Sequence, residues 1–110
     1  MTIDELIHES HAQACKSGWW VKGQERTFGD LIALCHSELS EALEDYRAGR
    51  ETKRIYHNDK TPTGIPIELA DLFIRVADLC GAYDIDLNAA IRLKMQYNTT
   101  RPERHGGKAI

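Results

Sequence analysis

The chain has 110 residues, with 14 Lys and Arg against 17 Asp and Glu, and a formal net charge of −3. This length suits one domain with one core, and the mild negative charge excludes nonspecific binding of a nucleic acid polymer, which needs a basic surface. No apolar run approaches the ~20 residues of a membrane span, and the acidic N-terminus lacks the order of a signal peptide. We therefore expect a cytoplasmic protein without a membrane partner. Its three cysteines, an odd number with no CxxC pair, are expected to be small buried side chains in a reducing compartment.

No stretch alternates with the period of a strand, so we predict an all-α fold of four to five helices. Thr2 and Glu5 have the spacing of a capping box and open a helix that runs to about residue 16, before Gly18. The loop that follows carries both tryptophans, Trp19 and Trp20. They either cap the core, since aromatic side chains bury much area, or form a stacking platform for a flat ligand such as a nucleobase.

The second predicted helix begins after Thr27 and runs from about residue 28 to 48, with Gly49 at its end. Glu38 borders the apolar stripe of this helix and Glu41 lies next to it, whereas ordinary solvated carboxylates lie opposite the core. This displacement indicates that the acids point toward a site. The stripe itself consists of Leu31, Cys35, Leu39, Ala42 and Tyr46.

Residues 49–65 form a polar connection that is too long for a simple turn between helices. It is either a solvated linker or a mobile lid that carries cations toward an anionic ligand. Pro66 suits the first turn of a third helix, which runs to about Cys80 and ends at Gly81. This helix is apolar except for one polar sector, so we predict a homo-oligomer with the helix near its interface. The sector consists of Glu68, Asp71, Arg75 and Asp78.

Asp84 or Asp86 caps a fourth helix, which is predicted from about residue 87 to 99. Lys94 and Asn98 fall on the same face as its apolar residues, where an acidic site could use a cation and an amide. Lys94 could equally extend outward along its apolar stem, and Asn98 could belong to a frayed helix end.

The tail at 101–110 is short, basic and rich in glycine, and it includes Arg101 and Lys108. Backbone amides freed by its glycines, beside these cations, could hold a phosphate. A frayed C-terminus is the alternative.

Two carboxylate pairs, Glu38 with Glu41 and Glu68 with Asp71, each have three-residue spacing, which places both members on one helix face. If the two helices pack side by side, all four carboxylates can converge. Like charges ~4–5 Å apart repel by a few kcal/mol at an effective dielectric near 20, so the set requires protons or a cation. A donor set of oxygens alone favours Mg²⁺, with Mn²⁺ as a substitute, over zinc. The chemistry that follows is metal-assisted phosphoryl or nucleotidyl transfer.

The ordered set of motifs resembles the MazG-like all-α nucleoside triphosphate pyrophosphohydrolases. The resemblance covers about residues 5 to 108. It implies a bundle-like protomer over 1–110 that is completed by packing in a homodimer or homotetramer. It further implies Mg²⁺-dependent hydrolysis of NTPs or dNTPs between the α and β phosphates, in nucleotide house-cleaning or pool control. The matching segments are ExxE at Glu38–Glu41, ExxD at Glu68–Asp71, Gly18-Trp19-Trp20, Lys94 to Asn98 with Arg101-Pro102, and His105-Gly106-Gly107-Lys108.

The resemblance also assigns roles to residues of this chain. Mg²⁺ would be bound by Glu38, Glu41, Glu68 and Asp71. The substrate would be contacted by Trp19 or Trp20 at the base and by Lys94 and Asn98 at the phosphates or sugar. Independently of the resemblance, Arg101 and Lys108 of the basic tail are expected to bind the substrate and stabilise charge on the leaving group. Glu41 is the predicted residue that orients the attacking water.

The family often opens its first motif with two glutamates, and this chain has Ser37 at the first position, which leaves the number of metal ions and the general base open. Two other functions remain alternatives. One is a non-catalytic helical oligomer that binds a partner, and the other is a phosphoribosyl-ATP pyrophosphohydrolase.

Overall fold

The computed structural model describes residues 1–101; the rest of the basic tail, with Lys108, lies outside the described residues. Most of the described chain is helical, as predicted, although it also contains one small antiparallel sheet. None of the helices in the described part is long and apolar enough to cross a membrane. The elements in chain order are α1 (Ile3–Lys16), α2 (Phe28–Arg47), β1 (Tyr56–Asn58), β2 (Thr61–Thr63), α3 (Ile65–Ala82) and α4 (Leu87–Thr99).

The helices begin where the predicted caps place them. The backbone N–H of Glu5 donates to the hydroxyl of Thr2 at 3.0 Å, and that of Asp30 donates to the hydroxyl of Thr27 at 3.1 Å. Both caps are reciprocal capping boxes, and the Asp86 side chain caps α4. Caps of this kind contribute about 1 kcal/mol each, and the predicted starts of α1, α2 and α4 are confirmed.

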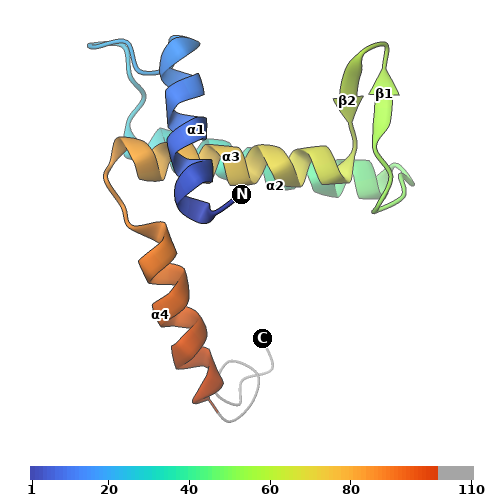
Figure 1. The fold of residues 1–110 in the computed structure, drawn as a ribbon. Coiled ribbons are helices and arrows are strands. Elements are labelled where there is room, and N and C mark those ends of the chain that lie inside the picture. Colours follow the sequence, from blue (N-terminus) through green and yellow to red (C-terminus); the bar gives the residue numbers. More distant parts are fainter. Residues whose placement is uncertain (102–110) are drawn as a thin grey trace.

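Helices α2 and α3 lie side by side, and α1 packs across α3 (Figure 1). The prediction that Gly81 ends α3 is wrong, because the helix continues to Ala82. A Cβ atom at Gly81 would lie 2.8 Å from the Cβ of His11 in α1, so this glycine permits close approach of the two helices. The core between the helices comprises Leu31, Cys35 and Leu79, flanked by Trp20, Leu34, Leu72 and Val76.

The prediction that the chain has no strands is wrong within the connection at 49–65, where β1 and β2 form a hairpin. The guanidinium carbons of Arg50 and Arg54 lie 4.6 and 4.8 Å from the centroid of the Tyr56 ring. The backbone N–H of Glu51 donates to the Tyr56 hydroxyl at 3.0 Å. Gly64, at φ 115°, joins the hairpin to α3, and a Cβ there would lie 2.9 Å from the Arg54 carbonyl oxygen. Contacts between residues several positions apart therefore order a segment that has no strand periodicity.

Helix α4 extends away from the other helices (Figure 1). Leu87 and Ile91, on its first turns, face α1 and α3 across an apolar cavity. No residue of α4 is buried, and Leu93 is 75% exposed. One protomer therefore leaves most of this helix without a packing partner.

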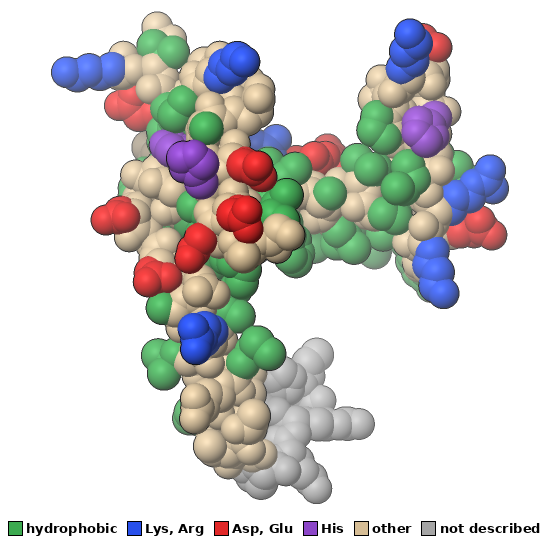
Figure 2. All heavy atoms as spheres, in the orientation of Figure 1, with side chains coloured by type: hydrophobic (Ala, Val, Ile, Leu, Met, Phe, Trp, Pro, Cys, Tyr) green, Lys and Arg blue, Asp and Glu red, His purple; other side chains and the backbone are tan. Residues whose placement is uncertain are grey.

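The buried stripe of α2 differs from the predicted stripe at three positions. Leu39 and Tyr46 are 47% and 63% exposed, whereas Glu38 is only 5% exposed. Cys15 is also exposed, contrary to prediction, although Cys35 and Cys80 are buried as free thiols. Figure 2 shows hydrophobic side chains gathered along the arm that α2 and α3 form.

Candidate metal centre and its adjoining cavity

Carboxylates from α2 and α3 converge in the structure. One oxygen each from Glu38, Glu41 and Glu68 lies within 4.8 Å of the others. The i, i+3 spacing places Glu38 and Glu41 on one face of α2, and Glu68 extends from the first turn of α3. Asp71, the fourth predicted ligand, lies outside this group of three and lines a cavity beside Glu38. We define Glu38, Glu41 and Glu68 as the carboxylate cluster.

Glu38 is the most enclosed member of the cluster. Its Oε1 accepts a hydrogen bond from Nε of Arg75 at 2.7 Å, across the α2–α3 interface. Its Oε2 is buried and has no hydrogen-bond partner among the described residues. Burial acts to raise the pKa of Glu38, but the hydrogen bond from Arg75, the neighbouring Glu68 carboxyl group and the guanidinium charge outweigh it and hold the pKa below its usual range.

The pKa values of Glu68 and Asp71 are shifted in the opposite direction to that of Glu38, that is, upward. Burial, followed by the proximity and charge repulsion of the Glu41 and Glu38 carboxyl groups, raises the pKa of Glu68 to about 8. Burial and the charge of Glu38 raise the pKa of Asp71, and the Arg75 charge partly offsets them. Burial and the neighbouring carboxyl groups therefore favour the protonated form of Glu68 when no cation is bound.

The carboxylate cluster fits a hard divalent cation. It offers only oxygen donors, which Mg²⁺ and Mn²⁺ prefer. Two of those oxygens, Oε2 of Glu38 and Oε2 of Glu68, are buried without a partner among the described residues, and an unsatisfied buried acceptor is costly unless something binds it. Ser37 lies at the position where this sequence differs from a motif that opens with two glutamates. Its hydroxyl donates to the Leu34 carbonyl at 2.6 Å on its own helix. It contributes no carboxylate to the cluster.

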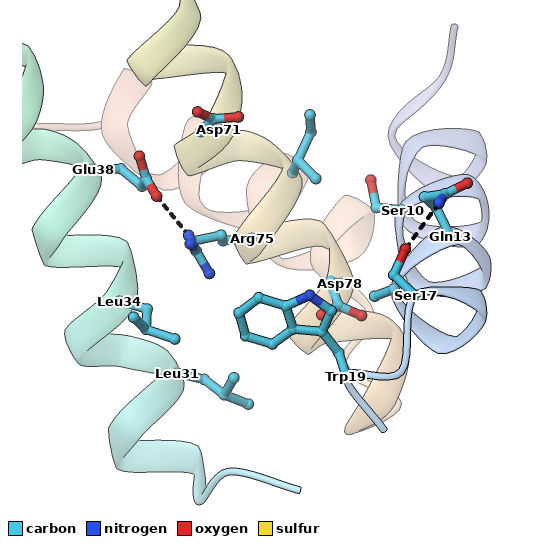
Figure 3. A pocket seen from close by; sticks show the side chains of 12 residues that line it. Ser10, Gln13, Ser17, Trp19, Leu31, Leu34, Glu38, Asp71, Arg75 and Asp78 are labelled. Atoms are coloured by element: carbon cyan, nitrogen blue, oxygen red, sulfur yellow. Dashed lines mark hydrogen bonds and ion pairs between the residues drawn. The ribbon is translucent and has the colours of Figure 1, made fainter. Parts of the chain in front are cut away.

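A cavity of about 290 Å³ adjoins the cluster (Figure 3). Glu38, Asp71 and Arg75 line one side of it, and Trp19 lies between α2 and α1 as part of its wall. The Trp19 ring is 38% exposed. The polar side chains Ser10, Gln13 and Ser17 extend from α1 and the turn that follows it, and the Gln13 amide donates to the Ser17 hydroxyl at 3.0 Å. The cavity thus joins an aromatic surface to an acidic one.

The two tryptophans have different surroundings. Trp20 packs against the core, and its Nε1 donates to Oδ1 of the buried Asp78 at 2.9 Å. The same oxygen lies 2.9 Å from Nδ1 of His11. Trp20 is therefore held as part of the core, whereas Trp19 has a face toward the cavity.

Three predicted substrate ligands lie on or just after α4, away from the carboxylate cluster. Lys94, Asn98 and Arg101 do not line the cavity. The Lys94 ammonium lies 4.9 Å from the centroid of the Tyr97 ring, and the Arg101 guanidinium carbon lies 5.8 Å from it. Lys108, the fourth of these predicted ligands, lies outside the described residues.

Sequence reasoning assigned no role to Arg75 and Asp78, although both line the cavity. The signal was present, because Glu68, Asp71, Arg75 and Asp78 follow one another at helical spacing and form one polar stripe on an otherwise apolar helix. That stripe faces the site. No periodicity in α1 distinguishes the cavity residue Gln13 from an ordinary surface side chain.

Comparisons of the chain with protein families, with curated proteins and with solved structures find no match.

Proposed function

We propose that the chain hydrolyses nucleoside triphosphates, or their deoxy counterparts, between the α and β phosphates with the help of Mg²⁺. The products are a nucleoside monophosphate and pyrophosphate. The observation that carries the proposal is the convergence of Glu38, Glu41 and Glu68 within 4.8 Å, from two sequence motifs about thirty residues apart. The choice of the scissile bond comes from the resemblance to MazG-like enzymes.

The cavity beside the cluster supports a nucleotide as the substrate. Its volume of about 290 Å³ can accept a nucleobase, and the Trp19 ring provides a surface on which a flat base stacks, an interaction worth ~1–3 kcal/mol. Ser10 and Gln13 offer hydrogen-bonding groups for the base edge. A ligand whose base lies against Trp19 would direct its phosphates toward the carboxylates.

The solvent exposure of each carboxylate indicates its role in the proposed reaction. Glu38 and Glu68 are enclosed and would hold the cation, with Asp71 beside them. Glu41 is exposed at the edge of the cluster, where a carboxylate can orient water and accept its proton. Bound Mg²⁺ supplies neutralisation of phosphate charge and increases the acidity of water.

The test is a panel of NTPs and dNTPs, with phosphoribosyl-ATP included, assayed for pyrophosphate release with Mg²⁺ or Mn²⁺. We expect pyrophosphate and a monophosphate, and a loss of at least about 100-fold in kcat/KM in Glu41→Gln, since general-base and positioning effects have this magnitude. Glu44→Gln changes an exposed acid on the same helix and should keep full activity. No release from any nucleotide with either ion would refute the enzyme and leave the partner-binding oligomer as the alternative.

We also infer that the protomer assembles into a homodimer or homotetramer that completes a helical bundle. Its accessible surface is 8603 Å², against about 6,200 Å² for a compact monomer of this mass. Its radius of gyration is 16.5 Å, against ~13 Å for a compact domain of about 100 residues. The excess area is of the size that each partner buries in an obligate interface, ~1,000–2,500 Å². The surface available for it includes Leu39, Leu43, Leu69, Phe73 and Ile74.

A further inference from the structure

Arg75 contacts both Glu38 of the carboxylate cluster and Trp19 in the wall of the cavity. Its Nε donates to Oε1 of Glu38 at 2.7 Å, and its guanidinium carbon lies 5.3 Å from the centroid of the Trp19 ring (Figure 3). Among the described residues that line the cavity, Arg75 is the one Lys or Arg. Its side chain is 30% exposed, so it can move without first being extracted from the core.

Glu38 needs a positive partner when no cation is bound to the cluster. Its side chain is 7% exposed, and an uncompensated buried charge is strongly destabilising. Arg75 supplies that partner at one oxygen, and the second oxygen, Oε2, has no partner among the described residues. A divalent cation at the cluster would bind the same carboxylate, so it and the guanidinium compete for the charge of Glu38.

We propose that Arg75 is a positioning residue that serves as the internal counter-ion of Glu38, and that a divalent cation binds the cluster in competition with it. This inference rests on the proposed function, because it assumes that the cluster binds a cation. Its consequence is that the free ion binds weakly. The ion binds well only together with the substrate, whose phosphate oxygens supply ligands that the three carboxylates do not.

The test measures binding of Mg²⁺ alone, by isothermal titration calorimetry with the full chain and no nucleotide. We expect Arg75→Gln to bind Mg²⁺ about tenfold more tightly than the wild type, because removing a nearby positive charge strengthens cation binding. Arg75→Lys keeps the charge and should stay within about threefold of the wild type. A matched control, Arg47→Gln, removes an exposed cation at the C-terminal end of α2 that pairs with Glu44 and should leave the affinity nearly unchanged. Arg75→Gln with an equal or weaker affinity for Mg²⁺ would overturn the inference.

A second measurement needs no variant of Arg75 and holds even if Arg75→Gln does not fold. The guanidinium lies over Trp19, so its displacement from Glu38 changes the surroundings of that ring. We expect Mg²⁺ to alter the tryptophan fluorescence of the wild type and to have no effect in Trp19→Phe, where Trp20 remains. An unchanged wild-type signal during a titration in which calorimetry records binding would show that Arg75 stays in place. The inference would then fail while the metal centre stands, whereas absence of Mg²⁺ binding to the folded protein both alone and with a non-hydrolysable nucleotide would refute both.

Discussion

Replacing Glu68 by glutamine should stabilise the cation-free protein at alkaline pH. Burial and the neighbouring carboxylates raise the pKa of Glu68 from 4.5 to about 8 in the folded chain. Between these values the folded protein holds a proton that the unfolded chain has released. The stability linked to that proton is fully present below pH 4.5 and is lost as the pH rises through about 8. A glutamine resembles the protonated carboxyl group and does not titrate, so Glu68→Gln avoids this loss.

The size of the effect follows from the shift. Each pKa unit corresponds to about 1.36 kcal/mol, so the rise of the pKa from 4.5 to about 8 gives an upper limit of about 5 kcal/mol above pH 8. The neighbouring Glu41 is exposed to solvent, and water there screens the repulsion. We therefore expect roughly half of the limit, about 2–3 kcal/mol in favour of Glu68→Gln at pH 8.5, and no difference at pH 4.5.

The assay is urea unfolding in EDTA at fixed protein concentration, from pH 4.5 to 8.5. Glu44→Gln is the matched control, because Glu44 is 71% exposed and, within residues 1–101, forms an ion pair only with Arg47, at 3.3 Å. Its difference from the wild type should stay within about 0.5 kcal/mol at every pH. Saturating Mg²⁺ should stabilise the wild type and not Glu68→Gln, since a ligand that binds only the folded state adds stability. A difference between Glu68→Gln and the wild type that is the same at all pH values would refute the electrostatic reasoning.

Three further predictions concern the tryptophans, the contact between α1 and α3, and the exposed apolar surface. Trp20→Phe removes the hydrogen-bond donor to Asp78 and should lower the free energy of unfolding by about 1–2 kcal/mol without changing KM. Trp19→Ala should raise KM several-fold and leave the melting temperature nearly unchanged. The reverse pattern would mean that Trp19 is the core residue and Trp20 the substrate contact. Gly81→Ala forces a Cβ into α1 and should cost about 1–3 kcal/mol in urea unfolding, despite the better helix propensity of alanine; a higher urea midpoint would contradict the close contact. Phe73→Asp, at a side chain that is 64% exposed, should reduce the mass measured by light scattering, and an unchanged mass would exclude this face from the oligomer interface.

The helix starts could be predicted because their causes are local. Thr2, Thr27 and Asp86 each accept a bond from a residue three positions ahead, and that spacing is visible in the sequence. The end of α3 could not be predicted from Gly81, because this glycine allows the close approach of α1 and does not end the helix. The hairpin was missed for a similar reason, since it depends on Arg50 and on other side chains that pack around one tyrosine.

In the candidate site, too, the features set by one helix could be predicted, whereas those set by the register between helices could not. The pairing of Glu38 with Glu41 follows from the geometry of one helix, and their convergence with Glu68 required only that α2 and α3 pack together. The partnership of Arg75 with Glu38 could not be predicted, because the register between two helices decides which side chains meet. The distance of Lys94 from the cluster reflects the direction in which the chain leaves α3, which is set by the turn around Asp84, at φ 55°.

If the proposed homo-oligomer forms, the isolation of α4 in one protomer should make the folding of this helix depend on protein concentration. Its 13 residues are near the length below which a helix is marginal in water, ~12–15 residues, and no residue of the helix is buried in one protomer. In the proposed homo-oligomer a neighbouring chain would supply most of the burial of α4, so that the helix would form in a bimolecular step. Hydrogen exchange at the amides of α4 should accordingly slow as the protein is concentrated, while exchange in the core of α2 and α3 changes much less.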